Sequence, residues 1–224
     1  MIDKQKTLAV HQRLTEVYGT PVNTHSGTDP LDELIATILS QNTSDVNSDR
    51  AFRRLKERFP TWMEVLEADP KEVYEAIKPA GLGAIKTPRI QQTLEEILVQ
   101  RGELSLDFLA DMEMDEARGW LCSLKGIGPK TAACVLMFAL DMPALPVDTH
   151  VHRVSRRLGL IGPRISAEKA HYLLESVVPP KAVLPFHINM IRHGRRVCRA
   201  LNPQCTGCPL YDLCDRVGVD GPYH

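Results

Sequence analysis

The sequence is poor in aromatic residues, which make up 5% of its 224 residues, and it has almost none of the apolar–polar alternation that marks β-strands. It also has no tandem repeat, no low-complexity tract and no apolar run long enough to span a membrane. These absences argue against a sheet protein, a repeat protein and a membrane protein. Apolar residues still make up 43% of the chain, which is enough for a packed core. We therefore expect an all-α protein with no membrane partner.

Apolar residues recur at helical spacing along most of the chain, and Asp29-Pro30 is a typical start signal before the first such segment. Helices are predicted at residues 31–40, 46–58, 61–68, 70–77, 86–100, 115–123, 130–141, 148–158, 167–177 and 183–194. The segment 130–140 is apolar on every side, so it should run through the middle of a helical domain. Pro143 and Pro146 then break the chain, which suggests a crossover between two lobes.

The formal net charge is −1, so the overall balance does not indicate a nucleic-acid partner. Residues 150–216 nevertheless contain eleven Lys and Arg against four Asp and Glu, so the C-terminal third of the chain is basic. This asymmetry is compatible with binding to a polyanion, and equally with arginines that merely solvate helix faces.

Four of the six cysteines form the pattern Cys198-x6-Cys205-x2-Cys208-x5-Cys214, whereas Cys122 and Cys134 are isolated. The polar N-terminus has no apolar stretch of signal-peptide type behind it, so we expect an intracellular protein in a reducing compartment. In such a compartment a cysteine group is more typical of metal binding than of disulfides. Four thiolates bind either one zinc ion or an iron–sulfur cluster, and the spacing leaves both open.

Two glycines separated by one residue lie between two predicted helices, in Leu-Lys-Gly-Ile-Gly-Pro-Lys-Thr-Ala at 124–132. Gly126 and Gly128 permit a tight turn, and the amides of the following helix start can donate to a phosphate. Ile127 should anchor the turn in the core. The pattern is typical of a helix–hairpin–helix, which grips a DNA backbone without reading its bases. An ordinary turn between helices is the alternative.

Lys130 stands in the first turn of the apolar helix. The positive helix end and partial desolvation favour the neutral amine, a nucleophile that can form a Schiff base with a sugar aldehyde. A simple phosphate contact explains the position equally well. Asp148 precedes the next helix, either as its N-cap or as a carboxylate that stabilises positive charge developing on a sugar. His150 could contact phosphate or be a buried structural histidine.

Two further turns are candidates for contact with bases. Gln41 and Asn42 lie in a polar segment, residues 40–45, where either side chain could fill a gap in base stacking; helix capping is the alternative for this segment. Leu82 lies between two glycines, and is either a wedge that intercalates into DNA or a loop residue facing the core.

Taken together, residues 124–132, 147–154 and 193–214 resemble endonuclease III, a family of the helix–hairpin–helix DNA glycosylase superfamily. Residues 39–45 are similar to the family's first DNA-facing loop. The resemblance implies that Lys130 is the Schiff-base nucleophile and Asp148 the catalytic carboxylate. It also implies that Cys198, Cys205, Cys208 and Cys214 hold a [4Fe-4S] cluster.

The resemblance further implies two helical domains that flank a DNA-binding cleft. A six-helix barrel with the helix–hairpin–helix is expected at residues 22–142, and an iron–sulfur cluster domain is expected from residues 1–21 with 143–224. The residues expected to contact DNA are Gln41, Asn42, Leu82, Gly126, Gly128, His150, Arg195 and Arg199.

The implied activity is base excision repair by a monomer in the cytoplasm or nucleoid. The enzyme would remove oxidised pyrimidines from duplex DNA through the lysine Schiff base and cut the strand 3′ to the abasic site by β-elimination. The alternative is a non-catalytic or differently specific damage-binding paralogue, for example one that recognises mismatches or uracil. Lys130 argues against relatives that only excise bases. Pro129 stands where an arginine is frequent in the family, which removes one possible phosphate contact.

Overall fold

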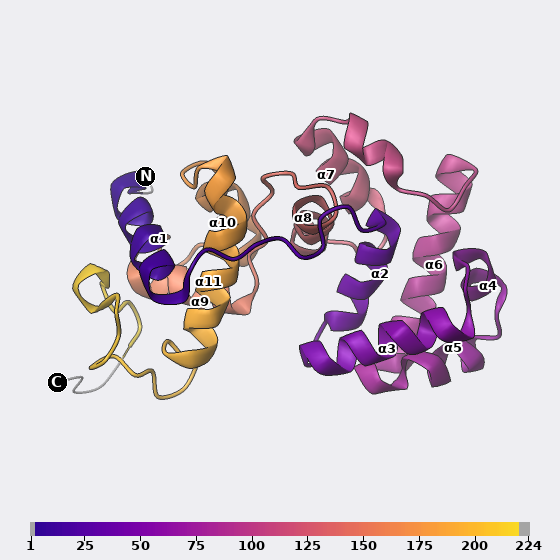
Figure 1. Ribbon diagram of the computed structural model, residues 1–224, viewed down its shortest axis with the longest axis horizontal. Coiled ribbons are helices and arrows are strands. Elements are labelled where there is room, and N and C mark those ends of the chain that lie inside the picture. The colour runs from indigo at the N-terminus through magenta and orange to yellow at the C-terminus, as the bar shows by residue number, and fades with distance from the viewer. Residues whose placement is uncertain (1–2, 220–224) are drawn as a thin grey trace. The chain divides into compact units, whose positions relative to one another are not determined.

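The computed structural model describes residues 3–219, which divide into two compact units (Figure 1). One unit, His25–Met142, is continuous in sequence, and the other combines the chain up to Thr24 with the chain from Pro143 onward. Residues 3–219 contain no β-strand, so the all-α prediction is confirmed. Within the same range, no helix has the length and apolarity needed to cross a membrane.

The continuous unit is built from six longer helices and one short one, within the described residues. They are α2 (Pro30–Ser40), α3 (Asp45–Arg58), α4 (Trp62–Glu67), α5 (Pro70–Ile77), α6 (Gly83–Arg101), α7 (Met114–Ser123) and α8 (Pro129–Phe138), with 3₁₀ turns η1 (Lys78–Ala80) and η2 (Asp107–Asp111). Helix α2 packs against α8 and α3, α5 packs against α6, and α7 packs against α8. Every residue of α8 from Thr131 to Met137 is buried, which confirms that this segment runs through the middle of its domain.

The starts of these helices follow from local capping. Asp29 accepts hydrogen bonds from the backbone amides of Leu31 and Asp32, so the predicted Asp-Pro start signal is confirmed. Ser44 accepts from the amide of Asn47, so Ser44 caps α3. Helix α6 begins at Gly83 instead of the predicted residue 86, because the turn is confined to the two residues before it.

The end of α8 also differs from the prediction, at Phe138 instead of residue 141. Asp141 adopts a left-handed conformation with φ 52°, and the amide of Met142 then bonds back to the carbonyl of Leu136 at 2.9 Å. This backbone reversal satisfies a carbonyl that the helix would otherwise leave unpaired.

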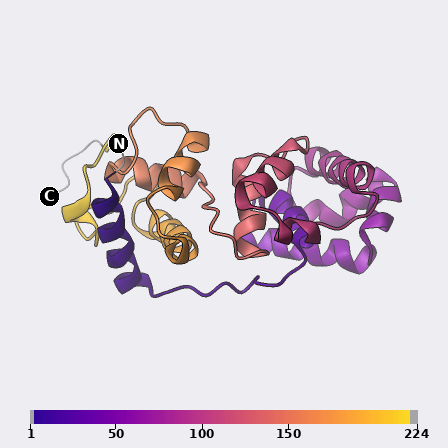
Figure 2. The same cartoon turned by 90° about the horizontal axis from the view of Figure 1, so that it is seen from above.

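The discontinuous unit contains α1 (Lys4–Tyr18), α9 (Thr149–Leu158), α10 (Ala167–Glu175) and α11 (Val183–Arg196), with 3₁₀ turns η3 (Pro180–Ala182) and η4 (Tyr211–Leu213). Helix α11 packs against both α9 and α1, so the two ends of the chain share one core around the fully buried Phe186 (Figure 1 and Figure 2). Periodicity alone did not predict α1, although Asp3 caps it by accepting from the amide of Lys6.

Candidate active site

The hairpin between α7 and α8 is anchored from the inside and open on the outside. Ile127 is 4% exposed and faces the core as expected, and Leu124, 1% exposed, does so as well. Gly126 has φ 81°, a left-handed conformation that favours glycine. Gly128 is the N-cap of α8 and offers no side chain to the first amides of the helix. These amides are therefore placed to receive an anion.

Lys130 is half-buried in the first turn of α8, next to the buried Thr131. The Glu33 carboxyl lies near it on α2, and its side chain is only 8% exposed. Burial raises the pKa of Glu33, while hydrogen bonds from His25 and Thr37 and the positive charge of Lys130 oppose that rise. The candidate nucleophile thus stands half-buried, within the electrostatic influence of a buried carboxyl group.

The two turns proposed to face bases both carry a residue in the left-handed region. Asn42 has φ 55° and is exposed, and Leu82 has φ 51° and is 50% exposed. Leu82 therefore does not face the core. A left-handed leucine is strained, and strain of this kind occurs mainly at functional sites. By contrast, Gln41 is held by the protein: its Oε1 accepts from Arg89 at 2.9 Å and its Nε2 donates to Thr131 at 3.4 Å.

In the discontinuous unit, Asp148 caps α9 by accepting from the amide of Val151 at 2.7 Å. Only Oδ1 makes this bond, and Oδ2 has no hydrogen-bond partner in residues 3–219. The capping role expected for Asp148 is confirmed, and one carboxylate oxygen remains available for a ligand. Lys130 belongs to one unit and Asp148 to the other.

His150 is half-buried in the first turn of α9. Its Nδ1 lies 3.1 Å from the guanidinium of Arg153, which also donates to the carbonyl of Gly194 at 2.9 Å. Burial lowers the pKa of His150, so the ring is neutral near pH 7. Arg195 and Arg199, at and after the end of α11, are exposed.

The four clustered cysteines line one small cavity, which Arg157 and His193 also border. Burial raises the pKa of the Cys208 thiol to about 11; the backbone amide of Leu210 opposes the rise and the neighbouring cysteines add to it. Because the sulfurs repel one another when charged, four thiolates here require a cationic partner. The donor set therefore fits a metal centre.

No three His, Cys, Asp or Glu side chains among residues 3–219 converge closely enough to bind one metal ion. A multi-iron cluster binds its cysteines through separate iron atoms, so it does not require the thiols to converge on one point. Backbone amides already point at two of the sulfurs, from Leu210 to Cys208 and from Arg216 to Cys214, each at 3.4 Å.

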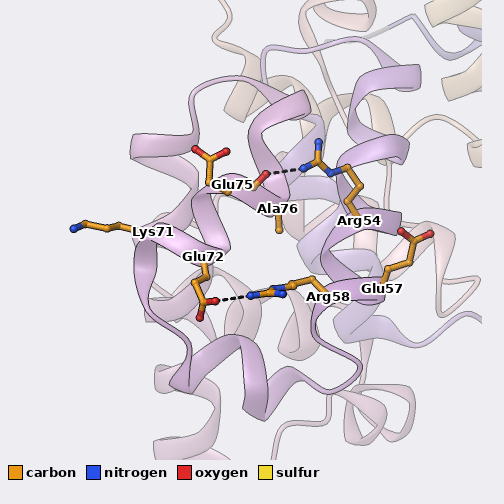
Figure 3. A pocket seen from close by; sticks show the side chains of 7 residues that line it. All are labelled: Arg54, Glu57, Arg58, Lys71, Glu72, Glu75 and Ala76. Carbon is orange, nitrogen blue, oxygen red and sulfur yellow. Dashed lines mark hydrogen bonds and ion pairs between the residues drawn. The ribbon is translucent and has the colours of Figure 1, made fainter.

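A larger open groove of about 600 Å³ lies between α3 and α5, away from these features (Figure 3). Its polar side chains partly neutralise one another: Arg58 pairs with Glu72 at 2.5 Å, and Arg54 donates to the carbonyl of Glu75 at 3.0 Å. None of the predicted site residues lines this groove.

Four residues that sequence reasoning did not single out join the predicted ones: Glu33, Lys86, Arg89 and Arg157. Each is a charged residue within a helix and carries no local pattern that separates it from a solvated one. Lys86, Arg89 and Arg157 each bind a group more than forty residues away, so no spacing rule could have found them.

The sequence matches the HhH-GPD family, described as a superfamily of base excision DNA repair proteins, over residues 35–180. Endonuclease III of Thermotoga maritima is 38% identical over 192 residues, which make up 85% of this chain and 85% of that protein. A relative from Arabidopsis thaliana is 37% identical over 165 residues, or 74% of this chain, and the match spans 56% of the Arabidopsis protein.

The fold is similar to that in a solved structure of a trapped endonuclease III–DNA covalent intermediate. The TM-score is 0.80 at 30% identity, over 96% of this chain and 97% of the other. The likeness therefore extends over both units and both groups of candidate residues.

Proposed function

The chain belongs to the endonuclease III family within the HhH-GPD superfamily of base excision DNA repair proteins, and we propose that it is a bifunctional DNA glycosylase and abasic-site lyase. Its substrates would be oxidised pyrimidines in the duplex DNA of the cell, bound by a monomer. The observation that carries this proposal is Lys130, half-buried at the uncapped start of α8 directly after the hairpin.

In the proposed reaction, a damaged base is first flipped out of the stack, which costs a few kcal/mol and less for a damaged base. The neutral amine of Lys130 attacks C1′ of the sugar, and the N-glycosidic bond breaks with its electrons leaving on the base. The adduct then loses one proton from nitrogen, and the C1′–O4′ bond breaks as O4′ takes up a proton. The nitrogen lone pair forms the C=N bond of an iminium that keeps one N–H. Loss of a C2′ proton then breaks the C3′–O bond and cuts the strand.

Asp148 supports these steps electrostatically in the proposal. A carboxylate with one oxygen held by a backbone amide and one oxygen free can stabilise positive charge on the sugar without moving. Its cap to α9 fixes its orientation in advance, and such preorganisation is a large part of electrostatic catalysis.

The proposed DNA contacts divide into backbone and base contacts. The backbone amides at the start of α8 that follow Pro129 would hold phosphates on one strand, and Arg195 and Arg199 would meet phosphates from the cysteine-bearing unit. His150 is half-buried and hydrogen-bonded, so it would contact DNA only at its exposed edge.

Leu82 would act as the wedge between bases, since it is exposed and strained. We assign the gap left by the flipped base to Asn42, because Asn42 is exposed at the tip of its turn while Gln41 is hydrogen-bonded at both ends of its amide. Gln41 would instead lie beside the lesion pocket.

For the cofactor, we propose a [4Fe-4S] cluster held by Cys198, Cys205, Cys208 and Cys214. Such a cluster would bind the loop after α11 to the core of its unit and so position the basic residues of that loop. Metal analysis together with absorption in the blue-violet region would distinguish it from zinc, which is colourless.

The deciding experiment uses a duplex with a single thymine glycol, with and without sodium borohydride. Borohydride reduces a Schiff base to a stable amine, so a covalent protein–DNA adduct is expected for the wild-type protein. Lys130→Gln should abolish both the adduct and strand cleavage while DNA binding persists. Lys71→Gln, an exposed lysine in the groove of Figure 3, is the matched control and should retain both.

An adduct that persists in Lys130→Gln would contradict the assignment of the nucleophile. Binding without adduct or cleavage in the wild-type protein, on both this duplex and an abasic-site duplex, would instead favour a non-catalytic damage-binding protein.

A further inference from the structure

A cation on α6 lies against the hairpin and at the same time holds Gln41. We propose that Arg89 is a further DNA-backbone contact, and that it couples the phosphate grip of the hairpin to the Gln41 side chain at the lesion pocket. The proposal rests on the proposed function in one respect, namely that the ligand is damaged duplex DNA.

The first support is the position of the Arg89 guanidinium. Nη1 donates to Oε1 of Gln41 at 2.9 Å, and Nε lies 3.1 Å from where a side-chain carbon on Gly126 would be. The guanidinium therefore spans from one DNA-facing turn to the hairpin. Glycine at 126 serves this contact as well as the turn, since a side chain there would displace Arg89.

The second support is the rigidity of the helix that carries Arg89. Lys86 lies one turn earlier on the same face of α6 and is 2% exposed. Its Nζ donates to the carbonyls of Leu39 at 2.7 Å and Ala80 at 2.9 Å, just before the turns of Gln41 and Leu82. Lys86 thus fixes α6 to both turns.

The same face of α6 reaches the hairpin a second time. About two turns after Arg89, Oε2 of Glu96 accepts from the amide of Lys125 at 2.8 Å. Lys86, Arg89 and Glu96 follow helical spacing, so one stripe of α6 holds three DNA-facing turns in a fixed arrangement.

The third support is the unused capacity of Arg89. A guanidinium has five N–H groups, and the bond to Gln41 is the only hydrogen bond or ion pair of this side chain in residues 3–219. The side chain is half-buried, so its remaining donors are partly accessible. Pro129 has no amide N–H to offer to a phosphate at the start of α8, so a donor from another element would add to the grip of the hairpin.

The coupling follows from the orientation of the Gln41 amide. Because Arg89 donates to its oxygen, the amide nitrogen points the other way and donates to Thr131, the residue after Lys130. A phosphate that accepts a hydrogen bond from Arg89 therefore perturbs the hydrogen-bond chain Arg89–Gln41–Thr131, which ends at the residue next to Lys130.

The test measures the equilibrium affinity for a duplex that contains a non-cleavable abasic-site analogue, as a function of salt. One lost phosphate contact lowers the magnitude of the slope of log K against log salt by about 0.9. Arg89→Gln should show this decrease, and Arg89→Lys should restore the slope because it keeps the charge. Arg101→Gln, an exposed arginine in the last turn of α6, is the control and should leave the slope unchanged.

The coupling is measured on the same duplex with Gln41→Ala and the double variant. If Arg89 acts partly through Gln41, the two single effects on affinity are not additive. An unchanged slope in Arg89→Gln, a slope that Arg89→Lys fails to restore, or additive effects would each overturn the proposal. These readouts do not depend on catalysis, so a failure of borohydride trapping in the wild-type protein would refute the proposed activity separately.

Discussion

Arg157 offers a quantitative test of what holds the cysteine loop. The side chain is 7% exposed on α9, and its guanidinium donates to the carbonyls of Arg199 at 2.5 Å and Ala200 at 2.9 Å, with Cys198 Sγ at 3.5 Å. Arg157→Met keeps the aliphatic stem but removes every donor, so two carbonyls lose charged partners. At roughly 1.5–3 kcal/mol for each such bond, the expected loss of unfolding free energy is about 3–6 kcal/mol.

The assay is urea unfolding of the purified protein, followed by far-ultraviolet circular dichroism. With a slope of about 2 kcal/mol per molar urea, the midpoint of the transition that reports this unit should fall by roughly 2 M. Arg216→Met is the control: Arg216 lies in the same loop but is exposed, and its variant should unfold near the wild-type midpoint. A shift for Arg157→Met no larger than that of Arg216→Met would refute the reasoning.

Two further substitutions test the continuous unit. Burial raises the pKa of Glu33, so the folded chain keeps this proton to higher pH than the unfolded chain, whose carboxyl titrates near 4.5. The unfolding free energy of the wild type, relative to that of Glu33→Gln, should therefore fall as pH rises above about 4.5. Urea unfolding of both proteins from roughly pH 4 to 8 measures this difference. A difference that does not change with pH would contradict the prediction. Leu82→Gly removes the strain of a left-handed leucine (φ 51°) and should be neutral or stabilising by up to about 1 kcal/mol, while affinity for lesion DNA falls. Thermal unfolding and DNA binding measure the two effects, and a clear loss of stability would show that Leu82 packs into the fold.

Helix positions were predictable because their signals are local. Asp29 before Pro30 caps α2, and the uniformly apolar segment after Lys130 is the buried α8. The errors were also local: the start of α6 was placed late because the whole Gly-Leu-Gly segment was interpreted as a turn, whereas Gly83 already begins the helix. Gly83 packs so closely that a side chain there would come within 2.8 Å of Tyr74.

The arrangement around the candidate site depends on contacts distant in sequence, and these were not predictable. Lys86 and Arg89 are charged residues in a helix, which by default are solvated, yet both bind groups more than forty residues away. Periodicity alone did not predict helix α1 for a related reason. Only Thr7, Val10 and Leu14 are buried on it, and α11, against which it packs, lies at the far end of the sequence. The cysteine spacing predicts a metal site, which stays a prediction, and nothing in the spacing indicates that Arg157 binds the carbonyls of the loop.

The packing of α1 against α11 has a consequence for how the protein is made. Helix α1 is synthesised first, but its partner leaves the ribosome roughly ten to forty seconds later at ordinary elongation rates. The continuous unit, His25–Met142, can complete its core during that interval. Val10 and Leu14 on α1 stay exposed until α11 has been synthesised. The cysteine-bearing unit is therefore the last to fold, and a nascent chain truncated before α11 would have a finished hairpin domain but neither the partner of α1 nor the four clustered cysteines.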